Sequence, residues 1–394
     1  MSCGKEYHAM VRGRKNVSNI KPRLFIAMIG DISTEPFSRV KYGFFIKALE
    51  KRFSIVICDA TLRGFPRFIT ALSAFQPNKK LWKERFYQNS LAFKMRSKKV
   101  ATQLLKNATQ VDVILQIGVL LDAHWTSKHI PSIIYTDYTT RLSSQKPELG
   151  RSPQKGKELA RLYDLEKKAF FRSNHICTRG KFLCESIAQD YAVPADWITP
   201  IGGGLNFDSL PLLQERTDFS HPTALFIGKD FYRKGGDLLL DAFKNVRVLL
   251  PDARLIMVTE GMPVNKFDLT GVEIIKPTWD REMIKVLYLK ADCFVLPSRL
   301  ETWGDVFLEA MAYGLPCIGV NGDAMNEIIR DHKTGLIIPP GDVNSLSDAL
   351  VFILSNREQR TKYGIAARLE VENHFTWDHV VSRLYPIIES SIHP

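Results

Sequence analysis

The sequence has no apolar run near the roughly 18 residues that a bilayer span requires. The stretch LFIAMIG after Arg23 starts like a signal peptide, but Asp31 ends it after seven residues, so we interpret it as a buried strand. The six cysteines include no CxxC pair, a usage typical of reduced thiols, and no cysteine-bound metal is expected. These absences favour a cytoplasmic protein.

Low-complexity tracts and short internal repeats are also absent, and the composition is that of an ordinary globular protein. Apolar residues make up 45% and charged residues 24% of the 394 residues, which argues against large-scale disorder. A chain of this length exceeds what one ordinary hydrophobic core organises. Two domains are therefore the first expectation.

Acidic residues are scarce in the first half only. Residues 1–204 contain 34 Lys and Arg against 16 Asp and Glu, a net charge of +18, whereas the remainder contains 20 against 26, a net charge of −6. This asymmetry predicts that the first half faces something anionic, which could be a membrane surface, a lipid phosphate or nucleic acid.

Short apolar runs alternate with helical patterns in both halves of the chain. The strand-like runs span 23–30, 53–60, 111–118 and 131–138 in the first half, and 223–228, 253–260, 271–277, 292–298 and 316–320 in the second. Helical spacing covers 40–51 and 82–106. Runs that are apolar on both faces suit parallel sheets covered by helices. The pattern predicts two doubly wound, Rossmann-like α/β domains.

Three glycines in ITPIGGGLNF (198–207) interrupt this periodicity and permit a hinge. We therefore expect an N-terminal domain over 1–204 and a C-terminal domain over 205–375. The last segment, 376–394, begins with Thr376 as a candidate N-cap and continues amphipathically. It is predicted to form a helix that crosses back to the N-terminal domain.

The stretch SRLETWGDVFLEAMAYGLPCI (298–318) contains a helix start that suits an anion. Helical periodicity begins at Asp305 and stops at Gly314, directly after a predicted strand. The helix N-terminus should therefore lie at the carboxyl edge of a parallel sheet, where open α/β sheets bind ligands. The backbone amides of Gly304, Asp305 and Val306, together with the positive end of the helix dipole, are expected to hold a phosphate.

Glu301 and Glu309 flank this anion site and need a different role. Ionised carboxylates only accept hydrogen bonds, so sugar hydroxyls are suitable partners, one at each end of a diphosphate. The spacing of the two acids predicts the order sugar, diphosphate and ribose along the site. The alternative is a pair of solvated carboxylates around a helix start.

The segment LFIGKDFYRKGGDLLLDAF (225–243) supplies cations after another predicted strand. Lys229, Arg233 and Lys234 lie in a glycine-bounded loop, although the P-loop pattern GxxxxGK[ST] is absent. We expect Lys229 and Lys234 to neutralise the diphosphate through charge-assisted contacts. The alternative is a solvated loop without a ligand.

Together these motifs resemble the group 1 glycosyltransferases, family four of the retaining enzymes. The resemblance extends to NEIIRDHKTGLIIPPGDVNSLSDAL (326–350) and is good over about 160–385. It implies a GT-B fold with two domains facing a central cleft, a nucleoside-diphosphate sugar as co-substrate, no cofactor or metal, and retention of anomeric configuration. The donor would bind the C-terminal domain, and a glycan, lipid-linked or small-molecule hydroxyl acceptor would bind mainly the N-terminal domain.

By position, the resemblance assigns Glu301 to the donor sugar hydroxyls as a catalytic residue and Glu309 to the ribose. Lys234 matches the diphosphate lysine, and Lys229 stands where an arginine is commoner. The implied donor-binding set is Lys229, Lys234, Thr302, Trp303, Gly304, Asp305, Val306 and Glu309. Asp305 stands where the family often has an apolar residue, and Trp303 replaces the commoner phenylalanine.

The first half departs from the family pattern. Ser38 and Arg39 stand near the usual glycine pair, and the histidine that often ends a later strand is missing, where IIYTDYTTRL offers Asp137. Asp137 is therefore a candidate catalytic base for the acceptor hydroxyl. Two alternatives stay open: Asp137 caps a turn at the strand end, or the departing phosphate takes the proton.

The stretch KKLWKERFYQNSLAFKMRSKKVATQLLK (79–106) carries nine basic residues and one acid among apolar and aromatic residues. A basic helix of this kind can lie on an anionic bilayer, which predicts a peripheral protein at the inner membrane surface. The alternative is a domain helix with a solvated basic face.

Two other functions compete with the enzyme. One is a non-catalytic GT-B descendant that acts as a glycan- or membrane-binding scaffold. The other is a nucleic-acid binder, for which no readout module is recognisable.

Overall fold

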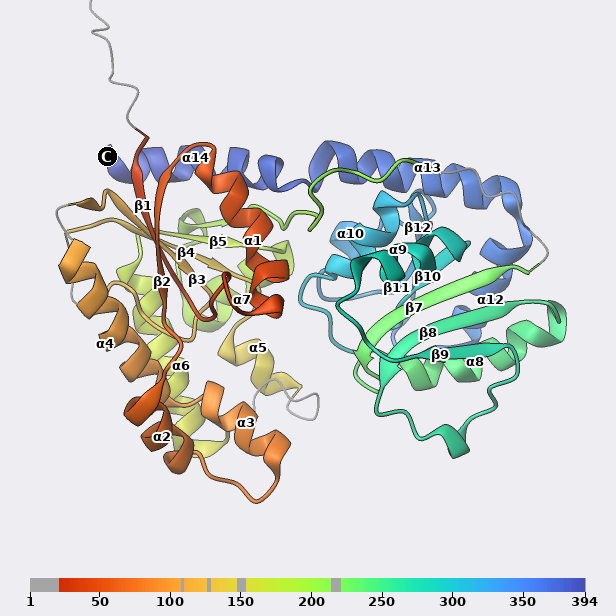
Figure 1. Cartoon of the computed structure of the whole chain (residues 1–394), viewed down its shortest axis with the longest axis horizontal. Coiled ribbons are helices and arrows are strands. Elements are labelled where there is room, and N and C mark those ends of the chain that lie inside the picture. Colours follow the sequence, from red (N-terminus) through yellow and green to blue (C-terminus); the bar gives the residue numbers. More distant parts are fainter. Residues whose placement is uncertain (1–20, 108–109, 126–128, 147–153, 214–220, 394) are drawn as a thin grey trace, which may run out of the picture.

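Two parallel β-sheets, one in each half of the chain, organise the structure (Figure 1). The computed structural model describes residues 21–107, 110–125, 129–146, 154–213 and 221–393. Each sheet has six strands, in the orders β2-β1-β3-β4-β5-β6 and β12-β11-β10-β7-β8-β9, and α-helices connect most successive strands in the described part of the chain. The prediction of two doubly wound α/β domains is confirmed.

The N-terminal sheet lies between helices that come from the same half of the chain and one helix from the C-terminus. Its strands are β1 (Arg23–Met28), β2 (Ser54–Asp59), β3 (Val113–Ile117), β4 (Ser132–Thr136), β5 (His175–Thr178) and β6 (Ile198–Pro200). The helices of this half are α1 (Pro36–Glu50), α2 (Gly64–Ser73), α3 (Lys79–Tyr87), α4 (Ser90–Asn107), α5 (Thr140–Gln145), α6 (Gly156–Arg172) and α7 (Lys181–Tyr191).

The C-terminal sheet repeats the arrangement with its own helices. Its strands are β7 (Thr223–Asp230), β8 (Arg254–Glu260), β9 (Val272–Ile275), β10 (Cys293–Val295), β11 (Cys317–Val320) and β12 (Gly335–Ile338). The helices are α8 (Gly236–Leu249), α9 (Arg281–Lys290), α10 (Asp305–Ala312), α11 (Met325–Ile328), α12 (Val343–Ser355), α13 (Arg357–His374) and α14 (Trp377–Ile392). The short strands β5, β6 and β12 have too few residues to show a strand period in the sequence.

Strand order decides where ligands can bind. In the C-terminal sheet, β7 lies between β8 and β10, so the connections after β7 and β10 leave toward opposite sides. In the N-terminal sheet the corresponding point lies between β1 and β3. Ligands of open α/β sheets bind in the crevice outside the carboxyl ends of strands at such points. The loops after β7 and β10 are the ones that carry the predicted cations and acids.

The helical pattern predicted over 82–106 is divided between two helices. The Asn89 side chain donates to the carbonyls of Arg85 and Phe86 at the end of α3, and its oxygen accepts the amide of Ala92 in α4, at 2.7 Å. A buried asparagine thus satisfies groups of both helix ends, which allows the chain to turn. A single helix over this range was wrong.

Two segments connect the halves of the molecule and lie side by side. The amide of Leu205 donates to the carbonyl of Phe375 at 2.7 Å. A Cβ atom on Gly203 would lie 2.7 Å from Trp303, and one on Gly204 would lie 2.5 Å from Trp377. The glycines therefore allow the backbone to approach two indole rings closely.

After this connection, α14 runs along the N-terminal domain, as the blue helix of Figure 1 shows. Val380, Leu384 and Ile388 are fully buried with Leu24 and Phe45 in one apolar cluster. The C-terminal helix therefore completes the core of the first domain.

We expect Leu384→Ala to lower the free energy of unfolding of the N-terminal domain by about 3 kcal/mol, because it removes a buried side chain and leaves a cavity. Glu389→Gln, at an exposed position of the same helix, is the matched control and should change it little. Denaturant titration of both variants measures the difference. Equal stability of the two variants would contradict this packing.

Candidate functional site

The loops after β7 and β10 are joined by backbone and side-chain hydrogen bonds. The amide of Arg299 donates to the carbonyl of Arg233 at 2.9 Å, and the Arg233 guanidinium donates to the carbonyl of Leu300 at 3.1 Å. Gly235 has φ +76°, and a Cβ there would lie 2.0 Å from the carbonyl oxygen of Pro297. Only glycine allows this close approach. The two predicted motifs therefore form one wall.

Lys234 and Glu301 meet in this wall. The Lys234 ammonium donates to the Glu301 carboxylate, and the two side chains are only 13% and 8% exposed. The amide of Glu301 donates to Asp323 at 3.0 Å, which fixes the loop. Lys229 lies elsewhere, since its side chain is 73% exposed and pairs with Glu260 at 3.3 Å. The structure brings Lys234, but not Lys229, to the acid.

The N-terminus of α10 lies directly after Glu301. Gly304 is its N-cap with φ +93° and no capping side chain, so the first turn leaves its amides to other partners. Asp305 lies in this turn and pairs with Arg179 of the N-terminal domain at 3.2 Å. The Arg179 side chain is 4% exposed. Burial lowers its pKa, but Tyr135 and Asp305 outweigh that effect and raise it, so the guanidinium stays charged.

Glu309 lies on the same helix and is buried. Arg281 donates to one of its oxygens at 3.3 Å and the Tyr288 hydroxyl donates to the other at 3.1 Å. Burial raises the pKa of Glu309, although Arg281 and Tyr288 act to lower it. The Arg281 side chain is 41% exposed. It therefore lies between the buried Glu309 carboxylate and the solvent.

The other predicted residues around the start of α10, Thr302, Trp303 and Val306, are partly or fully buried. Val306 is half-buried in the first turn of α10, and Thr302 is 6% exposed. Trp303 is 2% exposed and packs edge-on against Phe375, beside the glycines of the domain connection. The structure therefore gives Trp303 contacts with the connection between the domains rather than with the cleft.

The N-terminal domain contributes a polar cavity at the carboxyl ends of its strands. The cavity has a volume of about 250 Å³ and is lined by Ile29, Lys41, Tyr42, Tyr87, Gln88, 117–120, 136–140 and Ser143. Asp137 is in this lining and pairs with Lys41 at 3.3 Å. Burial lowers the pKa of Lys41, yet the Asp137 charge outweighs it and raises the pKa. A carboxylate and an ammonium thus lie together in a cavity at the sheet edge.

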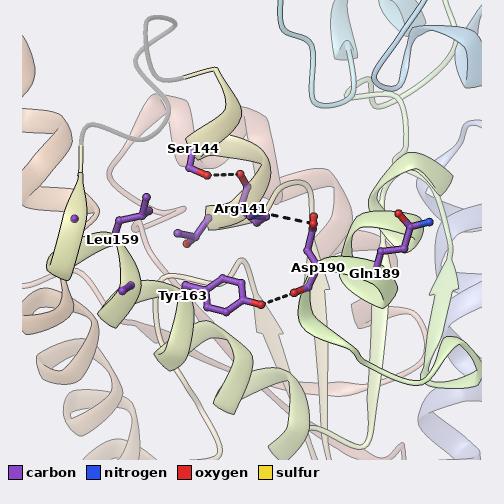
Figure 2. Close-up of a pocket in the computed structure, with 9 residues that line it drawn as sticks. Arg141, Ser144, Leu159, Tyr163, Gln189 and Asp190 are labelled. Atoms are coloured by element: carbon purple, nitrogen blue, oxygen red, sulfur yellow. Dashed lines mark hydrogen bonds and ion pairs between the residues drawn. The ribbon is translucent and has the colours of Figure 1, made fainter.

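Helix α5 separates this cavity from a second hollow of about 700 Å³ (Figure 2). Figure 2 shows the Tyr163 hydroxyl pointing to the backbone of Asp190, whose carboxylate faces Arg141. The fully buried Glu166 accepts hydrogen bonds from the amide of Thr140, at 2.9 Å, and from the hydroxyl of Tyr191. Glu166 therefore holds the start of α5.

Helix α5 in turn reaches the wall formed by the loops after β7 and β10. Lys146, just beyond its last residue, donates to the carbonyl of Arg299 at 3.0 Å and pairs with Asp323 at 3.5 Å. Close by, Glu327 of α11 accepts the amides of Lys181 and Phe182 at the start of α7. Acidic side chains of one domain thus bind helix ends and cations of the other.

Sequence reasoning missed Lys41, Arg179, Arg281 and Asp323. Arg179 follows the four-residue strand β5, a position at a strand end that would have marked it if the strand had been recognised. The others are ordinary charged residues of helices and loops, and no local pattern distinguishes them. Only the tertiary structure shows their role.

Among the described residues, no group of three or more His, Cys, Asp or Glu side chains is arranged to hold a metal ion. Of the five cysteines in the described ranges, four are buried, and Cys3 lies outside those ranges. No helix in the described part of the chain is long and apolar enough to cross a bilayer.

Comparison with known proteins concerns mainly the C-terminal domain. Residues 214–370 match the family described as glycosyl transferases group 1. The chain is 32% identical over 198 residues to the phosphatidyl-myo-inositol mannosyltransferase of Mycobacterium leprae, a match that covers 48% of this chain and 53% of that protein. It is 33% identical over 172 residues to the GDP-mannose-dependent monoacylated alpha-(1-6)-phosphatidylinositol monomannoside mannosyltransferase of Corynebacterium glutamicum, covering 40% and 44%. The chain spans about half the length of these curated relatives.

The likeness in three dimensions extends over both domains. Sucrose-phosphate synthase from Thermosynechococcus elongatus superposes with a TM-score of 0.67 over 94% of this chain and 98% of that one, at 17% identity. At this identity the likeness shows the fold alone, which is the GT-B arrangement of two facing α/β domains.

Folding should depend on pH through Glu166. Burial raises its pKa from 4.5 to about 7, although Tyr191 and Thr140 oppose the shift. The folded state therefore keeps a proton that the unfolded state loses, so the free energy of unfolding should fall as pH rises from about 4.5 to about 7, by about 3 kcal/mol at most, and then level off.

Glu166→Gln should remove this part of the pH dependence, as denaturant titrations across the same pH window would show. Asp164→Asn, at an exposed position of α6, is the matched control and should keep the wild-type slope. A slope that persists in Glu166→Gln would contradict the assignment.

Proposed function

Because residues 214–370 match the group 1 glycosyl transferases and the whole chain has the GT-B fold, we propose that this protein is a retaining glycosyltransferase. It transfers a hexose-like sugar from a nucleoside diphosphate to an acceptor hydroxyl. One observation carries the proposal: Lys234 and Glu301 meet beside the uncapped N-terminus of α10. A cation, a helix end and an acid thus surround one point at the sheet edge.

The positive groups act on the leaving diphosphate. Negative charge builds on its oxygens as the bond to the sugar breaks, and preorganised donors stabilise that charge most. Lys234 and the amides at Gly304, Asp305 and Val306 are suitably placed for this role, and Lys229 lies near the end of β7, before the loop that carries Lys234. Since these groups neutralise the leaving group, the reaction as proposed requires no divalent ion.

The acids act on the two sugars of the donor. When Lys234 turns to the diphosphate, the Glu301 carboxylate becomes available to the hydroxyls of the transferred sugar. Glu309 accepts a ribose hydroxyl through the oxygen that bonds to Tyr288, because this oxygen keeps a second lone pair, whereas the other oxygen already accepts two hydrogen bonds from Arg281.

The acceptor enters from the N-terminal domain. Its oxygen bonds to the anomeric carbon on the face that the diphosphate leaves, and its proton passes to the departing phosphate or to Asp137 in the polar cavity. The mycobacterial and corynebacterial relatives are named for phosphatidylinositol-based acceptors, which supports a lipid-linked hydroxyl among the possible classes. We place the reaction in the cytoplasm, where nucleotide sugars are substrates and thiols stay reduced.

Glu301→Ala should reduce kcat on the order of 100-fold while changing donor affinity much less, because the acid acts on charge that develops during transfer. The donor is first chosen by thermal shift among UDP-, GDP- and ADP-sugars. Product is then followed by NMR, which also reports whether the anomeric configuration is retained. Unchanged turnover in this variant would refute the role of Glu301, and an inverted product would refute retention.

Lys234→Ala should weaken binding of the free nucleoside diphosphate about 10- to 100-fold, since it removes a charge-assisted contact. Lys234→Arg keeps the charge and should retain much of the affinity, which separates loss of binding from misfolding around Glu301. Lys244→Ala, at an exposed position of α8, is the matched control. Calorimetry in which Lys234→Ala binds like Lys244→Ala would count against the site.

A further inference from the structure

Helix α2 leaves its apolar side chains on the surface. Phe65, Phe68 and Leu72 are 73%, 64% and 64% exposed, and Phe75 beyond the helix is 57% exposed. The spacing of three and four residues places them along one stripe, and the one buried residue of α2 is Thr70. Soluble monomers rarely expose a contiguous group of large apolar side chains without a partner.

Helix α3 holds this stripe in place and adds cations. The Trp82 indole donates to the carbonyl of Ala71 at 2.7 Å and packs edge-on against Phe75. The exposed basic residues around the stripe are Arg63, Arg67, Lys79, Lys80 and Lys83, and residues 63–83 contain no Asp or Glu. The two helices thus form one amphipathic surface on which basic residues outnumber acids, since Glu84 is the one acid of α2 and α3 and Arg63 pairs with Asp59 at 3.0 Å.

This charge selects the kind of partner. A second copy of the same surface would bring like charges together, which is unfavourable. An anionic bilayer accepts both features, because apolar side chains enter the acyl boundary and basic side chains contact the headgroups. The structure also moves the expected membrane surface, since Ala92, Phe93, Val100 and Leu104 of α4 are buried in the domain core.

The surface lies next to both substrate sites. Figure 1 shows α2 and α3 at the end of the N-terminal domain away from α14, with α3 on the side of the C-terminal domain. Tyr87 and Gln88, at the end of α3, line the cavity that contains Asp137. Lys80 pairs with Asp230, the last residue of β7, at 3.8 Å. A bilayer in contact with α2 and α3 would therefore lie at the entrance to the acceptor cavity.

We propose that the α2–α3 surface, formed by Phe65, Phe68, Leu72 and Phe75 with Arg63, Arg67, Lys79 and Lys83, docks on an anionic membrane and that the acceptor is a lipid of that membrane. The hydroxyl-bearing headgroup enters the Asp137 cavity while the acyl chains stay in the bilayer. The docking stands on the exposed surface alone, whereas the identity of the acceptor rests on the proposed function.

Vesicle flotation tests the docking without any need for activity. The full chain should float with vesicles of phosphatidylcholine and phosphatidylglycerol, and much less with phosphatidylcholine alone. The triple variant Phe65→Ser, Phe68→Ser and Leu72→Ser should lose most of this binding. Lys79→Gln and Lys83→Gln should each weaken it about fivefold, since each removes one charge near an anionic leaflet.

Val248→Ser with Leu249→Ser is the matched control, because these side chains are 77% and 65% exposed on the opposite domain, and it should float like wild type. The triple variant alters only exposed side chains, so its thermal midpoint should stay near that of wild type. Equal flotation with both vesicle types, wild-type flotation of the triple variant, or self-association through this face in sedimentation would overturn the docking.

The acceptor is tested separately. Transfer to a hydroxylated lipid in anionic vesicles should fall in the triple variant, whereas binding of nucleoside diphosphate in the absence of vesicles should not change. Vesicle binding with no transfer to any vesicle lipid would overturn the lipid acceptor and leave the docking intact. Loss of nucleoside diphosphate binding in Lys234→Ala addresses the proposed function independently of both results.

Discussion

Two opposite charges withdrawn from water, Lys234 and Glu301, hold together the part of the molecule on which the rest depends. Both side chains are largely buried, and each would be costly there without the other. Their meeting requires the loops after β7 and β10 to lie against each other, which Gly235 and Gly304 allow by adopting positive φ. In the proposed reaction the two groups separate, Lys234 toward the diphosphate and Glu301 toward the sugar. Contacts with the substrate then replace the contact between the two side chains.

Charges also connect the two domains across the cleft. Asp305 is an unexpected acid beside a predicted diphosphate, and Arg179 of the opposite domain neutralises it. Glu327 accepts amides at the start of α7, and Lys146 reaches the loop that carries Glu301. Arg179 is buried in its pair with Asp305, whereas the contacts of Glu327 and Lys146 are partly exposed and individually modest.

Local sequence patterns were sufficient to predict those features that depend on residues close together in the chain. The strands with strong apolar runs, the start of α10 and the loop around Lys234 could all be predicted, because periodicity, glycine and helix-start residues act over a few positions. The sequence did not indicate features that depend on contacts between distant residues. A buried Asn89 divides 82–106 into two helices, and the distant Phe375 gives Trp303 its packing partner. Lys229 extends to Glu260 instead of to the acid of the neighbouring loop.

By itself the sequence determined the two α/β domains and the chemical groups of the two loop motifs. The reason is that the spacing of apolar residues and the conformational preferences of the backbone depend on residues that are neighbours in the chain. Only the tertiary structure decided that Arg179 faces Asp305, that Asp137 shares a cavity with the end of α3, and that α2 rather than α4 exposes its apolar side chains. The physical reason is that burial and ion pairing depend on which surfaces meet, and those surfaces come from segments far apart in the chain.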